Sequence, residues 1–374
     1  MKIPIKNSAV ALILLILLLA GATGCRKADP IKLGFVGGLT GRFSDLGTAG
    51  RNGALLAVKE ANERGGINGR AIELITRDDK QDPTVAVQAD RELIAAGVTA
   101  IIGHMTSTMT LAALSLINEE QVLMVSPTTS TEELTGIDDY FFRVSATYKE
   151  ETESLADHAF HTRGLREIAA LYDLANRGYT EGFYQNFKEE FEKLGATIIF
   201  SKGFTSGKDL SFSTLADEIL STEADAMLIV AGALDTAMIC QQLRKKYFNG
   251  VIIPCGWAMT PELISHGGSA VEGLVISQQF DRNSTAPDYL HFKSDYRSRF
   301  GNEPNFASVH AYNAVNVILE ALSIDSNPDN LKRTIIAKKT FTGLQRDFEI
   351  DRYGDAHSQR ILLTIRNGQF TRID

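Results

Sequence analysis

The chain has 374 residues, of which 44% are hydrophobic and 22% are charged, and its formal net charge is −8. The length favours two domains, and the apolar fraction supports large buried cores. A net negative surface whose longest basic cluster is Arg244-Lys245-Lys246 repels phosphate backbones, so we expect no nucleic-acid partner.

The first 24 residues have the three parts of a secretory signal peptide. Lys2 and Lys6 precede an apolar stretch at 9–20, and Ala22-Thr23-Gly24 follows it. The apolar stretch is shorter than the roughly 20 residues that a membrane-spanning helix needs. Small residues before Cys25 resemble the lipobox of bacterial lipoproteins, although Leu is commoner than Ala at position 22. The resemblance implies an exported protein that a lipid on Cys25 anchors to a membrane in the cell envelope or periplasm, with lipid-free secretion as the alternative.

From residue 31 onward, short β-rich runs alternate with segments of helical period, a pattern typical of parallel sheets covered by helices. The first unit has predicted strands at 31–36, 72–76, 100–102 and 122–125, with helices at 54–61, 84–96 and 108–118. The second unit has predicted strands at 168–171, 197–200, 226–230 and 251–253, with helices at 181–194, 213–220 and 235–247. Two doubly wound (Rossmann-like) α/β units in tandem predict two lobes with a ligand cleft between them, at the carboxyl ends of the strands.

The pattern changes after residue 277. Predicted helices at 287–300, 306–322 and 331–336 follow one another, and a last strand is predicted at 360–365. The simplest topology returns the chain to the first unit and then to the second. The predicted lobe 1 therefore comprises 25–145 and 281–350, and lobe 2 comprises 146–280 and 351–374. Three crossings of this kind form a hinge about which rigid lobes close on a ligand.

Two cysteines remain beyond Cys25, so no disulfide framework organises the fold. The sequence allows either a bridge between Cys240 and Cys255 or two separate buried thiols.

Motifs spread along the whole mature chain carry a resemblance to a known family. They are Gly37-Gly38-Leu39-Thr40-Gly41, Asn62-Glu63-Arg64-Gly65-Gly66-Ile67-Asn68-Gly69, Asp78-Asp79, Ser126-Pro127, Tyr172-Asp173, Gln242-Leu243-Arg244 and Glu272-Gly273-Leu274. As an ordered set they resemble the branched-chain amino-acid (Leu/Ile/Val-binding) type of periplasmic solute-binding protein, the receptor of ABC importers. The resemblance implies the periplasmic binding fold type I, with Venus-flytrap architecture. It also implies a monomer that works with the membrane subunits of an ABC permease, without a cofactor and without catalysis.

Two hydroxyl-rich turns follow neighbouring strands of the first unit. Thr106-Ser107-Thr108 and Thr128-Thr129-Ser130 each precede a predicted helix, whose first N–H groups have no partner within the helix. Such a helix start favours an anion. Simple capping is the alternative, with Ser130 and Glu133 as a capping box. Together with the family's carboxylate site, the pattern predicts that Ser107, Thr128 and Ser130 bind a carboxylate of the ligand.

An amino-acid ligand also needs a partner for its ammonium group, because an unpaired charge is costly to bury. Family members that bind leucine-like ligands use a Glu in the loop that here reads Pro254-Cys255-Gly256-Trp257-Ala258, which has no carboxylate. Leucine itself is therefore not implied. Asp235 is the nearest replacement, since it opens a helix directly after a second-lobe strand, although it also suits a helix N-cap.

The remaining predicted site residues are apolar or aromatic. Leu46 falls near the family's side-chain wall, and Tyr179 and Trp257 lie in loops that follow strands. Both aromatic residues suit a ligand wall or the core. Arg177 either meets a second carboxylate or points into solvent.

Enzyme and metal signatures do not fit the sequence. G-x-S-x-G and H-E-x-x-H motifs do not occur, and Gly203–Asp209 is one residue short of a phosphate loop. His158 and His161 suit a solvated helix face better than a metal site. We therefore predict an extracytoplasmic receptor that captures a small carboxylate-bearing ligand, such as an amino acid, and delivers it to an ABC permease. A ligand-sensing receptor of the same fold and an exported enzyme are the alternatives.

Overall fold

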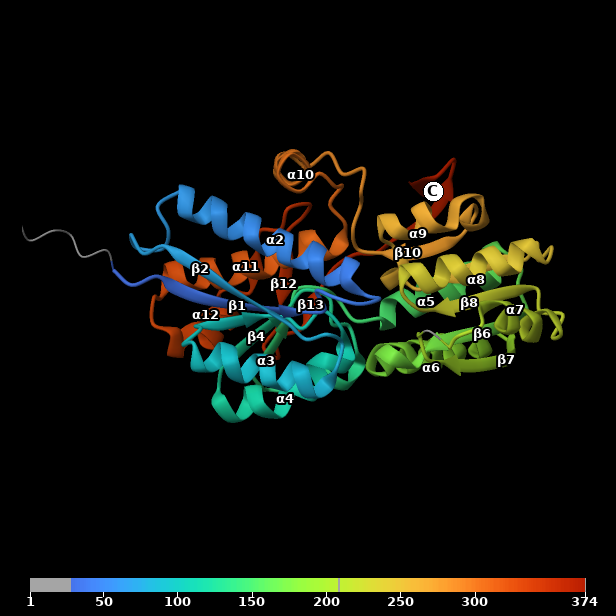
Figure 1. Ribbon diagram of the computed structural model, residues 1–374, viewed down its shortest axis with the longest axis horizontal. Coiled ribbons are helices and arrows are strands. Elements are labelled where there is room, and N and C mark those ends of the chain that lie inside the picture. The colour runs from blue at the N-terminus through green and yellow to red at the C-terminus, as the bar shows by residue number, and fades with distance from the viewer. Residues whose placement is uncertain (1–27, 208, 374) are drawn as a thin grey trace, which may run out of the picture.

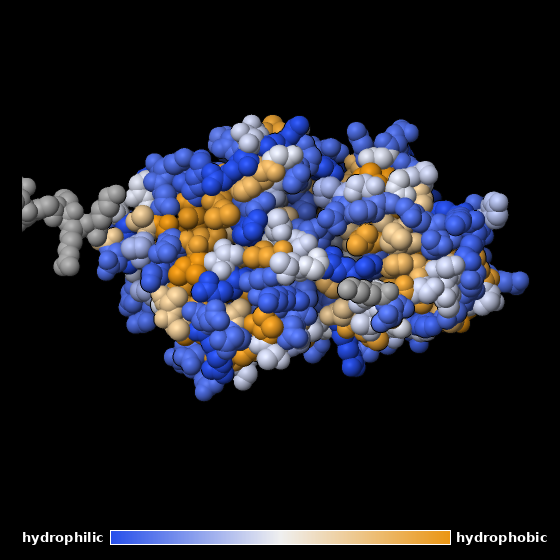
Figure 2. All heavy atoms as spheres, in the orientation of Figure 1, coloured by the Kyte–Doolittle hydropathy of each residue, from blue (hydrophilic) through white to orange (hydrophobic). Residues whose placement is uncertain are grey.

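The computed structural model describes residues 28–207 and 209–373. Two α/β lobes lie side by side along the long axis of the molecule, with β1 in one lobe and the C-terminal end in the other (Figure 1). The predicted signal peptide and Cys25 lie outside the described residues. Hydrophilic residues cover most of the face shown in Figure 2, and apolar residues show in patches between them. None of the helices in the described part of the chain is long and apolar enough to span a bilayer.

The first lobe contains a five-stranded parallel sheet in the order β2-β1-β3-β4-β5. Its strands are β1 (Ile31–Gly37), β2 (Ile72–Asp78), β3 (Ala100–Ile102), β4 (Leu123–Ser126) and β5 (Phe141–Arg143). The helices between them are α2 (Ser44–Glu63), α3 (Pro83–Ala95) and α4 (Ser107–Glu120). Successive side chains of a strand point to opposite faces. Ile102 accordingly belongs to the core cluster that includes Leu56 of α2, whereas Ile101 belongs to a second cluster with Leu93 of α3.

The second lobe repeats this arrangement with four parallel strands in the order β7-β6-β8-β9. Its strands are β6 (Glu167–Asp173), β7 (Thr197–Phe204), β8 (Ala226–Val230) and β9 (Val251–Pro254). Its helices are α5 (Lys149–Asp157), α6 (Arg177–Lys193), α7 (Phe212–Leu220), α8 (Ala233–Lys245) and α9 (Pro261–Gly267). Every residue of β8 is buried, as a central parallel strand covered on both faces requires.

The three helices after residue 286 return to the first lobe. They are α10 (Pro287–Phe300), α11 (Phe306–Ile324) and α12 (Leu331–Lys338). α11 packs against α2 and against β3 and β4, so it covers one face of the first sheet. A small antiparallel sheet follows, formed by β11 (Thr340–Phe341), β12 (Phe348–Ile350) and β13 (Ala356–His357).

The segment that follows residue 350 keeps contacts with elements of the first lobe. β13 still pairs with β12, and the Arg143 side chain of the first lobe donates from Nε to Asp355 Oδ1 at 2.8 Å. The chain then enters a second small sheet, β10 (Val275–Gln278), β14 (Ile361–Arg366) and β15 (Gln369–Arg372), of which β10 contacts β9. A buried ion pair and a hairpin thus keep residues 351–357 with the first lobe.

Local details also differ from the sequence predictions. Cys240 and Cys255 are separate, free and buried, which settles the open question of a bridge in favour of two thiols. The alternative interpretation of Ser130 and Glu133 as a capping box is excluded, because Thr131 Oγ1 accepts from the Glu133 N–H at 3.3 Å instead.

Candidate functional site

A cavity lies between the lobes, where the carboxyl ends of both parallel sheets face one another. Six of the predicted ligand-binding residues line it: Leu46, Ser107, Thr128, Ser130, Tyr179 and Trp257. Residues from the crossings, including Ser145 and Gln279, close the hinge side of the cavity. The strand order of each sheet changes direction beside its first strand, which is where such folds bind ligands.

The first-lobe wall presents hydroxyl and backbone N–H groups. α4 begins at Ser107, a residue only 2% exposed, and Thr106 at the N-cap donates its hydroxyl to Gln81 Oε1 at 3.0 Å rather than capping the helix. Thr128 lines the same wall and donates its hydroxyl to the Met105 carbonyl at 2.6 Å. Since the side chain at the N-cap is used elsewhere, the first turn of α4 keeps donors for an anion.

Asp235 lies outside the lining of this cavity. Its carboxylate accepts hydrogen bonds from Arg42 of the first lobe, with Nε to Oδ1 at 2.9 Å, and from the Ser206 hydroxyl. The Asp235 side chain is fully buried, and that of Arg42 is 28% exposed. Asp235 therefore joins the two lobes directly, and its carboxylate is already paired.

The acid that lines the cavity is Glu151 of α5, which the sequence analysis missed. Glu151 Oε1 accepts from the Gly256 N–H at 2.6 Å, and Oε2 pairs with Arg360 Nη1 at 2.9 Å. Burial raises the pKa of the Glu151 carboxyl, whereas Arg360 and the Gly256 N–H act in the opposite direction. The loop 254–258, which lacks a carboxylate of its own, thus receives one from a different element.

Two buried nitrogen atoms on the hinge side have no partner within the described residues. Arg360 donates from Nη2 to the Thr147 carbonyl at 2.6 Å, but its Nε is unpaired. His310 of α11 lines the same cavity, and its Nδ1 is also unpaired. Burial, reinforced by the charges of Arg360 and Arg346, lowers the pKa of His310 to about 4. The imidazole is therefore neutral at pH 7.

The second-lobe wall is aromatic. Tyr179 and Trp257 are 5% and 8% exposed, and their rings meet edge to face with centroids 6.2 Å apart. Trp257 also packs on Phe43 of the first lobe, with centroids 5.0 Å apart. Tyr179, which the sequence pattern placed in a loop, lies in the first turn of α6. Arg177, the first residue of the same helix, pairs with Glu181 on its surface and does not line the cavity.

Direct contacts hold the lobes together around the cavity. The Thr260 hydroxyl donates to Asp45 Oδ2 at 3.0 Å, and the Gly178 N–H donates to Thr108 Oγ1 at 2.9 Å. The Arg42–Asp235 pair adds a charged contact on the same boundary. The conformation is a closed one, in which both walls face the same small space.

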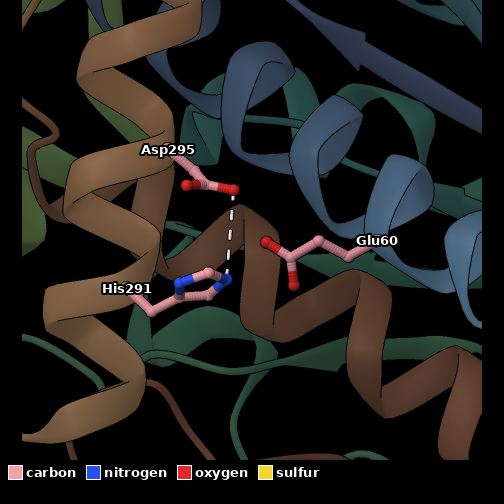
Figure 3. Close-up of side chains that lie close together, drawn as sticks. All are labelled: Glu60, His291 and Asp295. Carbon is pink, nitrogen blue, oxygen red and sulfur yellow. Dashed lines mark ion pairs between the residues drawn. The ribbon is translucent and has the colours of Figure 1, made fainter.

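One group of potential metal ligands is present in the described part of the chain, and it lies outside the cleft. Glu60, His291 and Asp295 place a nitrogen or oxygen atom each within 4.8 Å of one another (Figure 3). His158 is nearly buried, and its Nε2 accepts from Arg163 Nε at 3.3 Å, so it makes no such group with His161.

Comparison with known proteins gives one consistent family. Residues 30–359 match the model of the periplasmic binding protein family. The leucine-specific-binding protein of Salmonella typhimurium is 29% identical over 279 residues, which is 73% of each chain. The leucine-, isoleucine-, valine-, threonine- and alanine-binding protein of Pseudomonas aeruginosa is 24% identical over 336 residues, covering 88% of this chain and 87% of its own.

Solved structures agree in fold. A leucine-binding protein from Thermotoga maritima superposes with a TM-score of 0.84 at 26% identity, covering 92% of this chain and 98% of its own. A branched-chain amino-acid transporter substrate-binding protein from Streptococcus pneumoniae, in complex with isoleucine, also gives a TM-score of 0.84, at 22% identity with 91% and 97% covered. The two-lobed type I periplasmic binding fold predicted from the sequence is confirmed.

Proposed function

Because this chain belongs to the periplasmic binding protein family, we propose that it captures a small zwitterionic ligand of the amino-acid class outside the cytoplasm and delivers it to an ABC permease. The observation that carries this proposal is the composition of the cleft. One wall holds the helix start at Ser107 with further hydroxyl groups, and the facing wall holds a buried carboxylate, Glu151. A carboxylate on the ligand suits the first wall, and an ammonium group suits the second.

We assign the ammonium partner to Glu151 rather than to Asp235. Glu151 lines the cavity and Asp235 does not. Among the described residues, each oxygen of Glu151 accepts a single hydrogen bond, one from the Gly256 N–H and one from Arg360. A carboxylate oxygen has two lone pairs, so both oxygens of Glu151 keep one for the ligand. Leu46, Tyr179 and Trp257 would then enclose the side chain of the ligand.

The unpaired nitrogens on the hinge side narrow the ligand class. Arg360 Nε carries a hydrogen and needs an acceptor, and neutral His310 needs a partner for Nδ1. A buried donor without an acceptor costs about 1–3 kcal/mol. A ligand with a side-chain oxygen, in an amide or hydroxyl group, would remove this cost, and a purely aliphatic ligand would not.

Calorimetric titration of the mature protein with single amino acids tests the proposal. We expect saturable binding of at least one neutral amino acid, with asparagine, glutamine, serine or threonine bound more tightly than leucine or valine. If leucine binds most tightly, the proposal of an amino-acid receptor stands, but Arg360 Nε and His310 Nδ1 do not select a ligand with a side-chain oxygen. Failure of every amino acid, together with mass spectrometry of the native protein that finds a bound compound without an amine, would refute the amino-acid assignment.

Lobe closure is the mechanism that this architecture supports. We propose that lobe 1 comprises residues up to 145 and 281–357, and lobe 2 comprises 146–280 and 358–374, with crossings near 145, 280 and 358. The contacts of Gln279 with the backbone of Ala146, at 3.1 and 3.3 Å, join two of the crossings. Small-angle scattering should show a smaller radius of gyration at saturation with ligand, and an unchanged profile would contradict closure.

We also propose that the mature protein is a monomer anchored by a lipid on Cys25. The motif Ala22-Thr23-Gly24-Cys25 after an apolar stretch supports this. Cys25→Ser should release the processed protein from the membrane fraction of cells, because a serine cannot carry the thioether-linked lipid. A Ser variant that is processed and stays with the membrane would refute lipid anchoring.

A further inference from the structure

Three side chains with metal-binding atoms meet between two helices of the first lobe, on the side of α2 that faces α10. Glu60 projects from α2, and His291 and Asp295 project from successive turns of α10 toward it (Figure 3). His291 Nε2 lies 3.9 Å from Asp295 Oδ2. The i, i+4 spacing places these two on one face of their helix. None of the three lines the ligand cavity between the lobes.

Glu60 is the residue that makes this group more than a surface cluster. It is 9% exposed, and its Oε1 is buried without a hydrogen-bond partner in the described chain. Its other oxygen, Oε2, accepts from the Tyr312 hydroxyl at 2.6 Å and lies 3.7 Å from Arg64 Nη1. A buried carboxylate oxygen without a donor is costly, so this position favours a cation beside Oε1. Figure 3 shows one oxygen of Glu60 turned toward the gap between His291 and Asp295.

We propose that Glu60, His291 and Asp295 bind a divalent cation of the zinc class. Imidazole with two carboxylates suits Zn²⁺ and neighbouring first-row ions better than Mg²⁺ or Ca²⁺, which prefer oxygen ligands alone. Zn–N and Zn–O bonds of about 2.0–2.1 Å in a tetrahedron place ligand atoms about 3.3 Å apart. The His291–Asp295 distance therefore has to shorten by about 0.6 Å, and the distances to Glu60 by at most about 1.5 Å. Rotation of the 70% exposed His291 side chain and of the 35% exposed Asp295 side chain allows this.

The proposed ion would join α10 to the rest of the first lobe. α10 stands at the edge of this lobe, beside α2 (Figure 1), and α2 is the main element that it contacts. Three protein ligands leave one tetrahedral position open. Glu60 and His291 line a groove of about 430 Å³, together with Asn316 and Thr342, so water or a small anion can reach the ion and complete the coordination.

Isothermal titration of the chelator-treated mature protein with ZnCl₂ tests the site. We expect one equivalent to bind, with His291→Ala and Asp295→Asn each weakening the affinity at least 10-fold, in the range measured when metal sites lose a supporting group. MgCl₂ at a 100-fold excess should not displace the ion. Both substituted side chains are partly or largely exposed, so the variants should fold.

A matched control comes from the same chain. His161 pairs with Asp157 at 3.7 Å with the same i, i+4 spacing, but no third carboxylate joins them in the described residues. His161→Ala should leave the Zn²⁺ affinity unchanged. Arg64→Ala should tighten binding several-fold, since it removes a positive charge that lies 3.7 Å from Glu60.

Cobalt provides a readout that is independent of affinity. Co²⁺ should give the visible absorption of a four-coordinate ion in the parent protein, and His291→Ala should abolish it. Titration that gives no heat, an unaffected His291→Ala variant, or equal losses in His161→Ala and His291→Ala would overturn the proposal.

Discussion

The two walls of the cleft present polar groups of different kinds. The first-lobe wall offers the start of a helix, with hydroxyl and N–H groups at Ser107 and Thr128, and carries no charged side chain at that position. The second-lobe wall uses a buried ion pair, Glu151 with Arg360, beside the aromatic rings of Tyr179 and Trp257. Fixed dipoles on one side and an ion pair on the other give a closed cavity with no net charge, which favours a zwitterion over an ion.

The largest loss of ligand affinity is expected at Glu151. Glu151→Gln removes the negative partner of the ligand's ammonium and leaves Arg360 buried without its counterion. Losing one member of a buried charge pair costs about 2–5 kcal/mol, so the Kd should rise by about 30-fold to several thousand-fold. Calorimetric titration with the amino acid that binds best measures this.

The neighbouring acid provides the control for this experiment. Glu150→Gln changes an exposed residue of the same helix and should bind like the parent. Equal affinity in Glu151→Gln and the parent protein would mean that Glu151 does not bind the ammonium group of the ligand. The proposed difference between the two walls would then be refuted.

A smaller effect is expected at the first wall. Ser107→Ala removes one hydroxyl group, and the backbone donors of the helix start remain. A hydrogen bond to a charged group contributes about 1.5–3 kcal/mol, so the Kd should rise about 10-fold to 150-fold. Ser115→Ala, an exposed position on the same helix, should have no effect. Unchanged binding in Ser107→Ala would place the carboxylate elsewhere.

The same contrast explains which part of the site was predictable from sequence. The first wall follows from local pattern, because hydroxyl residues come directly after two apolar strand segments. β3 and β8 match their predicted ranges, 100–102 and 226–230, for the same reason. Glu151 and Arg360 are far apart in the sequence, and only the third crossing between the lobes brings them together. The missing carboxylate in the loop 254–258 was the one available signal that an acid had to come from another element.

The local sequence pattern does not predict elements that are very short or that depend on partners distant in the sequence. β5, β11 and β13 have two or three residues each, too few to show an alternating pattern. The contacts of residues 351–357 with the first lobe, a hairpin and the Arg143–Asp355 pair, leave no periodic signal in the sequence, so pattern alone could not indicate them. Asp235 suited an ammonium partner by position, but its role depends on Arg42 from the opposite lobe.

Acid should lower the stability of the folded protein through His310, on the hinge side of the cavity. His310 has a pKa of about 4 in the folded protein, against about 6.5 for an ordinary histidine, because it is buried near Arg360 and Arg346. The unfolded chain therefore takes up this proton first as the pH falls, and stability is lost between pH 6.5 and 4 and is fully retained above pH 6.5. Two pH units correspond to about 2–3 kcal/mol.

Urea unfolding at pH 6.5 and pH 4.5 measures this contribution. His310→Gln cannot take up the proton, so it should lose about 2 kcal/mol less than the parent over this interval. His357→Gln, at an exposed position, should follow the parent. The same loss in His310→Gln and the parent would show that His310 is not held neutral.

The smallest effect is expected at the Arg42–Asp235 pair, a direct contact between the lobes outside the cavity. Arg42→Ala removes a charged contact between the lobes without touching the cavity, so it should disfavour the closed form alone. The Arg42 side chain is 28% exposed, so its truncation to Ala admits water to the Asp235 carboxylate, which also keeps the hydrogen bond from Ser206. The loss should therefore stay near the 0.5–1 kcal/mol of a partly exposed ion pair, and the Kd should rise about 2-fold to 5-fold. Arg77→Ala breaks an ion pair of 2.8 Å within the first lobe and should leave the Kd unchanged.

Because salt screens exposed charges, the difference in Kd between Arg42→Ala and Arg77→Ala should shrink at high ionic strength. Scattering profiles of ligand-free Arg42→Ala that show a larger radius of gyration than the parent would locate the effect in closure, whereas equal profiles and equal affinity would mean that the pair does not hold the lobes together.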